Sequence, residues 1–172
     1  MTTARHLIDT DEGGDEPYLD RVAGIALRVA VRQGTDPSRP PLVLLNGIGA
    51  RLELLDGFVE HVDARITVIR FDVPGVGGSP AVRFPYQFWM LAELVRRLVA
   101  HLGHRRYDVL GISWGGGLAQ QMAFQQPRAL RRLVLAATAS GSLMVPGHPR
   151  VLSKMVTPHR YRDPDFAREV AA

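Results

Sequence analysis

Apolar residues recur along the chain with two periods, one typical of strands and one typical of helices. Between Gly24 and Gly34, isoleucine, leucine and valine take every second place, which predicts a half-buried strand near the edge of a sheet. The run 42–45 is apolar on both faces, as in a strand buried within a parallel sheet. The same reasoning predicts strands over 66–71, 107–112 and 133–137.

Segments with helical spacing of their apolar residues separate these strands. They predict helices over 52–62, 88–102 and 115–126, and Gly103 and Pro127 end the second and third of them. Strands and helices alternate in this way where right-handed crossovers build a parallel sheet covered on both faces. We therefore expect an α/β fold with a mostly parallel, doubly wound sheet.

The pattern also divides the chain of 172 residues, whose length suits one domain. Residues 1–16 are polar and acid-rich, which predicts a flexible N-terminal segment. Residues 17–140 hold all the predicted strands and form the expected core. From 141 to 172 four prolines interrupt the periodicity, so this tail is not expected to continue the sheet.

Composition and charge exclude several classes of function. The formal net charge is +4, but the basic residues, all arginine except Lys154, are scattered, so we expect no nucleic-acid partner. The chain has no cysteine and therefore neither a thiol nucleophile nor a cysteine-ligated metal. No apolar run approaches the roughly 20 residues that span a bilayer, and no secretory signal is visible. A cytoplasmic protein without a membrane span is the expectation.

Reactive chemistry is indicated by a G-x-S-x-G sequence at 111–115, between a predicted strand and a predicted helix. In this context the motif predicts a nucleophile elbow, a sharp turn that holds a serine hydroxyl above the sheet. Glycines are needed on both sides because side chains there would collide. Ser113 is therefore the candidate catalytic nucleophile, and the alternative is a serine that merely caps the helix.

A second glycine-containing turn, N-G-x-G at 46–49, follows the buried strand 42–45. An oxyanion hole needs two backbone N–H groups, typically one after the nucleophile and one from such a loop. Ile48 and Trp114 are the candidates for these two groups. The alternative is an ordinary turn that leads into the helix at Leu52.

The third glycine-rich turn, 72–79, has no Lys-Ser/Thr after it and so is not a P-loop. We interpret it as a structural turn and do not assign Asp72 to a catalytic triad. A dinucleotide-binding oxidoreductase is also disfavoured, because no G-x-G-x-x-G follows the first strand. The sequence predicts neither a cofactor nor a metal site.

The order N-G-x-G, D-x-P-G-x-G-x-S, G-x-S-x-G resembles the α/β-hydrolase superfamily. The fuller strings closely resemble the intracellular depolymerases of medium-chain-length polyhydroxyalkanoates, over most of residues 18–165; these strings are 44–50, 70–80, 111–121 and 136–147. The resemblance implies a serine hydrolase that cleaves a polyester and associates with hydrophobic polymer granules in the cytoplasm. It also implies that 141–172 begins a lid over the site.

The sequence departs from this family in one respect, because the triad order is Ser, then Asp or Glu, then His. Only residues 114–172 follow Ser113, and they hold one clear strand. We expect a fold truncated before its last strands, an exposed sheet edge, and little or no turnover by the chain as given. The remaining candidates for the triad are expected to be exposed lid residues; they are His148, His159, Asp163 and Asp165.

Two further questions stay open at this level. The apolar segment 143–145 could line an acyl pocket or contact a granule, or simply pack in the core. The substrate could instead be a small ester, as for a general carboxylesterase or lipase, and a cofactor-free perhydrolase would use the same triad. A third possibility is a non-catalytic binding protein on the same fold.

Overall fold

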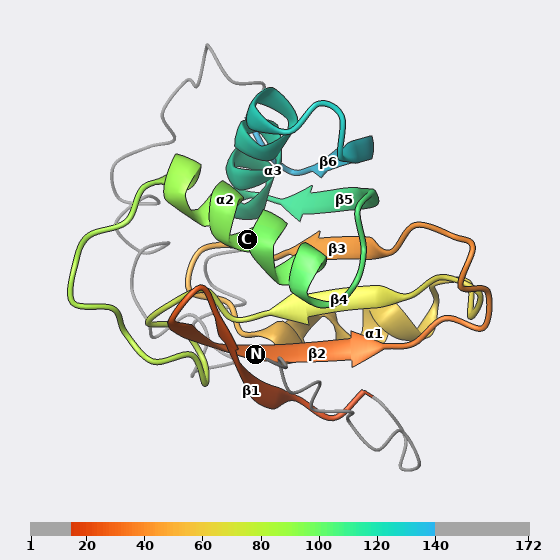
Figure 1. Cartoon of the computed structure of the whole chain (residues 1–172), viewed down its shortest axis with the longest axis horizontal. Coiled ribbons are helices and arrows are strands. Elements are labelled where there is room, and N and C mark those ends of the chain that lie inside the picture. Colours follow the sequence, from red (N-terminus) through yellow and green to blue (C-terminus); the bar gives the residue numbers. More distant parts are fainter. Residues whose placement is uncertain (1–14, 140–172) are drawn as a thin grey trace, which may run out of the picture.

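A mixed sheet forms the centre of the fold (Figure 1). The computed structural model describes residues 15–139, and within them the strand order is β1-β2-β4-β3-β5-β6. The strands are β1 (Tyr18–Val22), β2 (Ile25–Arg32), β3 (Leu42–Leu45), β4 (Val68–Phe71), β5 (Tyr107–Ile112) and β6 (Leu130–Ala136). The helices are the 3-10 helix η1 (Leu52–Leu55), α1 (Asp56–Glu60), α2 (Phe88–His101) and α3 (Trp114–Gln125).

The sheet is mostly parallel, as the sequence predicted. The pairs β3–β4, β3–β5 and β5–β6 run parallel, while β1–β2 and β2–β4 are antiparallel. In the register of β3 and β5, Leu45 lies opposite Gly111. The loops that leave the carboxyl ends of these two strands therefore begin side by side, at the edge where α/β sheets place their sites.

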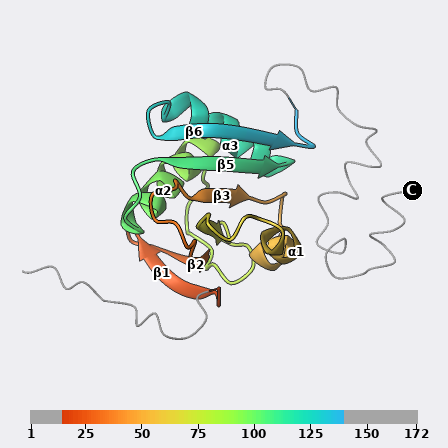
Figure 2. The ribbon, with the colours of Figure 1, turned by 90° about the vertical axis from the view of Figure 1, so that its right-hand side faces the viewer.

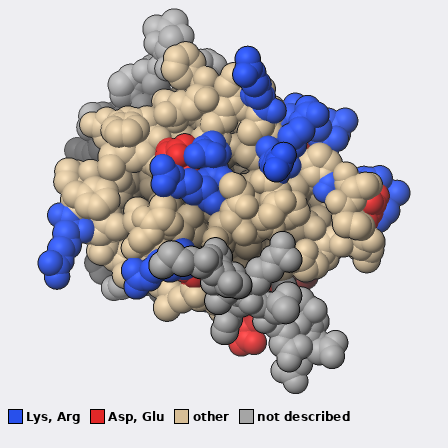
Figure 3. Space-filling view, viewed as in Figure 1, with Lys and Arg blue, Asp and Glu red and all other residues tan. Residues whose placement is uncertain are grey.

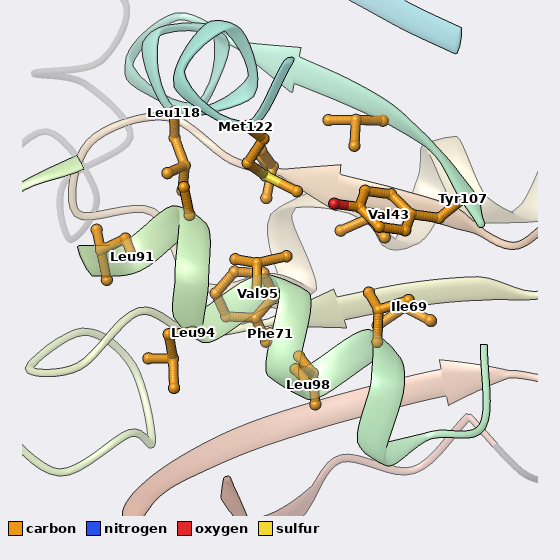
Figure 4. Packing of buried hydrophobic residues seen from close by; sticks show 14 of the residues in the cluster. Val43, Ile69, Phe71, Leu91, Leu94, Val95, Leu98, Tyr107, Leu118 and Met122 are labelled. Carbon is orange, nitrogen blue, oxygen red and sulfur yellow. The ribbon is translucent and has the colours of Figure 1, made fainter. Parts of the chain in front are cut away.

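Helices cover both faces of the sheet, which makes it doubly wound. Figure 2 shows α1 on one side of the sheet and α2 and α3 on the other. The larger hydrophobic core lies under α2 and α3 (Figure 4); its labelled members are Val43, Ile69, Phe71, Leu91, Leu94, Val95, Leu98, Tyr107, Leu118 and Met122. The smaller core lies under η1 and α1 and consists of Leu44, Leu55, Val59 and Val68. Neighbouring strand residues thus serve opposite faces.

The strand predicted between Gly24 and Gly34 near the edge of the sheet is β2. It lies one place in from the edge, because β1, which the sequence pattern did not predict, pairs with it on the outside. Ala23 (φ 50°) and Gly24 (φ 85°) form the two-residue turn of this hairpin, with the left-handed angles that such a turn needs. The sequence pattern did not predict β1, because two of its five residues are charged and weaken the apolar alternation typical of a strand.

The helix predicted over 52–62 is also shorter than expected. One 3-10 turn and five α-helical residues take its place, so not every crossover carries a long helix. β6 begins at Leu130, three residues earlier than predicted. The pattern missed this start because the second and third residues of the strand are arginines, which interrupt its apolar run. Within the described residues β6 forms one edge of the sheet and β1 the other. Val134 in β6 is 50% exposed, which agrees with the expected exposed edge.

Surface arginines stand in separate groups, as Figure 3 shows for the face that α2 covers. Arg96 and Arg97 both form ion pairs with Glu93, at 2.6 and 2.8 Å. Arg131 pairs with Asp108 at 2.5 Å. These arginines pair with acidic neighbours, which fits the scattered placement of basic residues seen in the sequence.

A buried polar contact joins the two large helices to the sheet. Tyr107 at the start of β5 is 1% exposed, and its hydroxyl donates to the side-chain oxygen of Gln126. The Gln126 amide nitrogen donates in turn to the carbonyl of Ala92 in α2, at 2.7 Å. Because burial disfavours a phenolate, it raises the pKa of Tyr107 to about 12.

We expect this tyrosine to limit stability in alkaline solution. Its folded pKa lies above the ordinary value of 10.0, so its contribution is complete below pH 10 and is lost as the pH rises toward 12. By pH 11 the loss is about 1 kcal/mol of the free energy of unfolding. Urea unfolding of the wild type and Tyr107→Phe between pH 8 and 11 measures it. Parallel curves for the two proteins would contradict the assignment.

Candidate active site

Ser113 lies on the turn between β5 and α3, with φ 53° and ψ −117°. A positive φ is found in about a few per cent of non-glycine residues, because it strains the backbone. Such a conformation persists where the surrounding structure imposes it. The Ser113 N–H donates to the carbonyl of Ala136 at 3.0 Å, and the Ser113 carbonyl accepts from the N–H of Gly116 at 2.9 Å. These two bonds fix the turn from both sides.

The Ser113 side chain is half-exposed and makes no capping hydrogen bond to α3. The alternative in which this serine merely caps the helix is therefore wrong. Its hydroxyl stands at the amino end of α3, where the helix dipole presents a positive end. The geometry is that of a nucleophile elbow, while the catalytic role of Ser113 stays a prediction.

The two glycines of the motif are required by close approach. A Cβ built on Gly111 would lie 2.5 Å from the carbonyl oxygen of Gly115. A Cβ on Gly115 would lie 2.2 Å from the carbonyl oxygen of Leu45 in β3. Because the obstructing atoms are backbone, neither contact can be relieved by a side-chain rotation, and the turn excludes larger residues here.

The loop after β3 lies against the elbow. A Cβ built on Gly47 would be 4.0 Å from the Cβ of Ser113. The Asn46 side chain fixes this loop internally, accepting from the Gly47 N–H at 2.8 Å and donating to the Arg51 carbonyl at 2.9 Å. The structure thus brings this loop beside Ser113, where a loop that supplies a second oxyanion donor has to lie.

The two predicted oxyanion donors belong to these neighbouring segments. Trp114 is the first residue of α3, so its N–H is one of the amides that a helix leaves without an intrahelical acceptor. Ile48 lies at the exposed part of the loop, with 39% of its surface accessible. Their participation in an oxyanion hole stays a prediction.

A small pocket lies beside the elbow, and its lining is apolar apart from a few polar groups, among them the Asn46 amide. Its lining residues are Leu45, Asn46, Gly47, Ala50, Phe71, Val73, Trp114 and Leu118. The Trp114 ring also contacts Phe88, with ring centroids 5.0 Å apart and planes tilted by 56°. Most of the lining residues are apolar and none carries a charge, so the wall of this small hollow beside the elbow is largely hydrocarbon.

The third glycine-rich turn is structural, as interpreted from the sequence. Asp72 is completely buried and accepts from the N–H groups of Leu52 at 2.8 Å and Gly78 at 2.9 Å. Arg28 adds a third donor at 3.3 Å. A carboxylate engaged in this way is poorly placed to orient a histidine, which supports leaving Asp72 out of the triad.

None of the histidines in the described region is placed to act as a base for Ser113. His61 contacts the carbonyl of Gly57 at 2.7 Å, and His101 contacts Asp20 at 3.2 Å. His104 follows α2, and burial lowers its pKa. The four triad candidates of the tail, the predicted lid and the segment 143–145 lie outside the described residues, as does most of the predicted flexible N-terminal segment.

The described part of the chain holds no group of three or more side chains that could bind a metal ion. It also holds no helix long and apolar enough to cross a membrane. What residues 15–139 do bring together is a strained serine, an adjacent glycine loop, the amino end of a helix and a small, largely apolar hollow. Acyl chemistry needs a nucleophile beside backbone N–H donors, and these roles of Ser113, Ile48 and Trp114 stay predictions.

A family model described as the alpha/beta hydrolase fold matches residues 40–172. The chain belongs to the α/β-hydrolase family. Among curated relatives, the poly(3-hydroxyalkanoate) depolymerase of Ectopseudomonas oleovorans is 47% identical over 91% of this chain and 56% of its own length. A pimeloyl-[acyl-carrier protein] methyl ester esterase of Aeromonas hydrophila is 36% identical over 58% of this chain and 38% of its own.

Solved structures agree with this assignment. The crystal structure of a membrane phospholipase A, described as a bacterial virulence factor, has a TM-score of 0.75 and 25% identity, covering 92% of this chain and 51% of its own. A hydrolase from Pseudomonas aeruginosa PA01 has a TM-score of 0.68 and 25% identity, covering 91% of this chain and 66% of its own. This α/β-hydrolase chain spans about half the length of the depolymerase that it matches.

Sequence reasoning missed two features of this α/β-hydrolase site. One is the contact of Phe88 with Trp114, which joins the start of α2 to the elbow. The other is the set of bonds from Asp72 to Leu52 and Arg28, residues 20 and 44 positions away. The only signal for the second was an acidic residue at a strand end in a glycine-rich turn, which does not identify its partners.

Proposed function

We propose that the full-length protein is a serine ester hydrolase that depolymerises medium-chain-length polyhydroxyalkanoate. The observation that carries this proposal is the geometry of Ser113, a half-exposed serine in left-handed geometry whose hydroxyl is not used to cap α3. Membership of the α/β-hydrolase family supports acyl chemistry at this position. The 47% identity to a poly(3-hydroxyalkanoate) depolymerase supports the substrate class.

In this mechanism the Ser113 oxygen attacks the ester carbonyl carbon, and a histidine from outside residues 15–139 accepts the hydroxyl proton. The carbonyl oxygen becomes an oxyanion, which the N–H groups of Ile48 and Trp114 stabilise. The intermediate collapses, the alcohol leaves with the proton, and an acyl-serine remains. Water then attacks the acyl carbon and gives a proton to the same histidine, the acyl group leaves as a hydroxyacid, and the histidine returns the proton to the Ser113 oxygen.

The surface beside the elbow supports an apolar substrate. The small hollow there has walls that include Phe71, Val73 and Leu118, and none of its lining residues carries a charge. We propose a hydrophobic polyester as substrate, a polymer granule as the surface on which the enzyme works, and the cytoplasm as its compartment. The role of 141–172 as the start of a lid is part of the same proposal.

Product release from defined substrates tests this function. The full-length protein is incubated with a suspension of medium-chain polymer and, separately, with short nitrophenyl esters, before and after treatment with a fluorophosphonate. We expect hydroxyacid monomers or oligomers from the polymer and their loss after treatment. Activity on short esters alone would favour a general carboxylesterase, lipase or perhydrolase. Binding of polymer without any hydrolysis would favour a non-catalytic protein.

A further inference from the structure

The loop that carries Ile48 is held at both of its ends by side chains. At the first end the Asn46 side chain bridges the Gly47 N–H and the Arg51 carbonyl, at 2.8 and 2.9 Å. At the far end the Leu52 N–H donates to a carboxylate oxygen of Asp72, at 2.8 Å. Between these clamps the Ala50 N–H donates to the Gly47 carbonyl at 3.1 Å.

The carboxylate of Asp72 joins three segments that are distant in the sequence. One oxygen accepts from Leu52, and the other accepts from Gly78 at 2.9 Å and from Arg28 at 3.3 Å. Asp72 follows the central strand β4, and its own N–H donates to the Arg28 carbonyl of β2 at 2.9 Å. The far end of the loop is thereby fixed to the rigid sheet.

The surroundings of Asp72 leave it little freedom to move. It is 0% exposed, and a Cβ built on Gly77 would lie 2.2 Å from one of its carboxylate oxygens. Arg28 forms a second ion pair with Glu53 at 2.5 Å, which ties the guanidinium to η1 as well. Asp72 and Arg28 thus form a link between the sheet and the first residues after the loop.

We infer that Asp72 is a positioning residue, which sets the place of the Ile48 amide against Ser113 through its bond to Leu52. This inference rests on the proposed function, since it gives the loop a catalytic task. The loop approaches Ser113 closely at Gly47, so a small displacement changes the distance from the Ile48 amide to a developing oxyanion. Misplacement by about 1 Å costs a rate factor of about 100.

Asp72→Asn in the full-length protein tests the inference, because asparagine keeps the shape but turns one acceptor oxygen into a donor. We expect kcat for a nitrophenyl ester to fall by about 10- to 100-fold per active site, with KM changed by less than about threefold. A trifluoromethyl ketone should lose affinity by a similar factor. The Ser113 oxygen adds to its carbonyl carbon, the base takes the proton, and the oxyanion that forms needs the same donors.

Asp63→Asn is the matched control. Asp63 is exposed, accepts from the Arg65 N–H at 3.0 Å and pairs with the Arg65 guanidinium at 2.6 Å. Asp63→Asn therefore weakens a backbone hydrogen bond and an ion pair, as Asp72→Asn does, but away from the loop. Active sites are counted by fluorophosphonate labelling. Equal kcat per labelled site and equal ketone affinity in Asp72→Asn and Asp63→Asn would overturn the inference, because Asp72 would then serve folding alone.

Two further outcomes are separable. If Asp72→Asn does not fold, Arg28→Lys decides, because it removes the planar group that joins Asp72 to Glu53. We then expect a fall in kcat of about threefold to tenfold with the same pattern, and an unchanged kcat would overturn the inference. Absence of labelling in the wild type would instead contradict the proposed function, which this design keeps distinct from a failure of the positioning role.

Discussion

Replacing Ser113 with alanine in the full-length protein is expected to lower kcat for a nitrophenyl ester by about 10⁴- to 10⁶-fold. Alanine removes the oxygen that attacks the carbonyl, so no acyl-enzyme can form. The substitution removes one atom from a half-exposed side chain that caps no helix, and stability should change by less than about 1 kcal/mol. A large kinetic effect with a small stability effect separates a nucleophile from a structural residue.

Covalent labelling measures the same assignment directly. A fluorophosphonate should modify the wild type at Ser113, as mass spectrometry of the digested protein locates it, and should leave Ser113→Ala unmodified. Ser38→Ala is the control, because Ser38 lies exposed in a turn, where its hydroxyl donates to Asp36 at 2.6 Å. Equal labelling of Ser113→Ala and Ser38→Ala would remove Ser113 as the nucleophile.

The parts of the fold that the sequence predicted best are those with a strong local pattern. The helix over 88–102 appears as α2, and its regularly spaced residues Leu91, Val95 and Leu98 are buried against the sheet. The pattern failed at β1, because that strand carries charges and is defined by its pairing with β2. Strand pairing is a long-range interaction, which local periodicity does not record.

The same distinction applies to the candidate site. The strand-to-helix context of the motif placed Ser113 on a sharp turn, and the strand ends placed 46–49 beside it, because both are consequences of local geometry and sheet topology. The role of Asp72 in holding this loop was not predictable. It depends on Leu52 and Arg28 meeting at one buried carboxylate, and only the folded chain brings them together.

The substitution Gly115→Ala tests how closely α3 approaches the loop end of β3 at the elbow. The added methyl carbon would lie 2.2 Å from the Leu45 oxygen and 2.5 Å from the Asn46 oxygen, both of them backbone atoms. Relief requires α3 to move away from β3, and we expect a loss of about 3 kcal/mol or more in the free energy of unfolding. Urea unfolding of the full-length protein measures this loss.

Gly57→Ala is the matched control for the elbow, since Gly57 lies inside α1 and a Cβ there meets nothing within 4 Å. Alanine should stabilise that helix by about 0.5–1 kcal/mol, because it restricts the unfolded chain. The two substitutions add the same methyl group and are expected to have opposite signs. If Gly115→Ala were tolerated as well as Gly57→Ala, the close approach of α3 to β3 would be absent, and with it the constraint that holds Ser113 in its left-handed geometry.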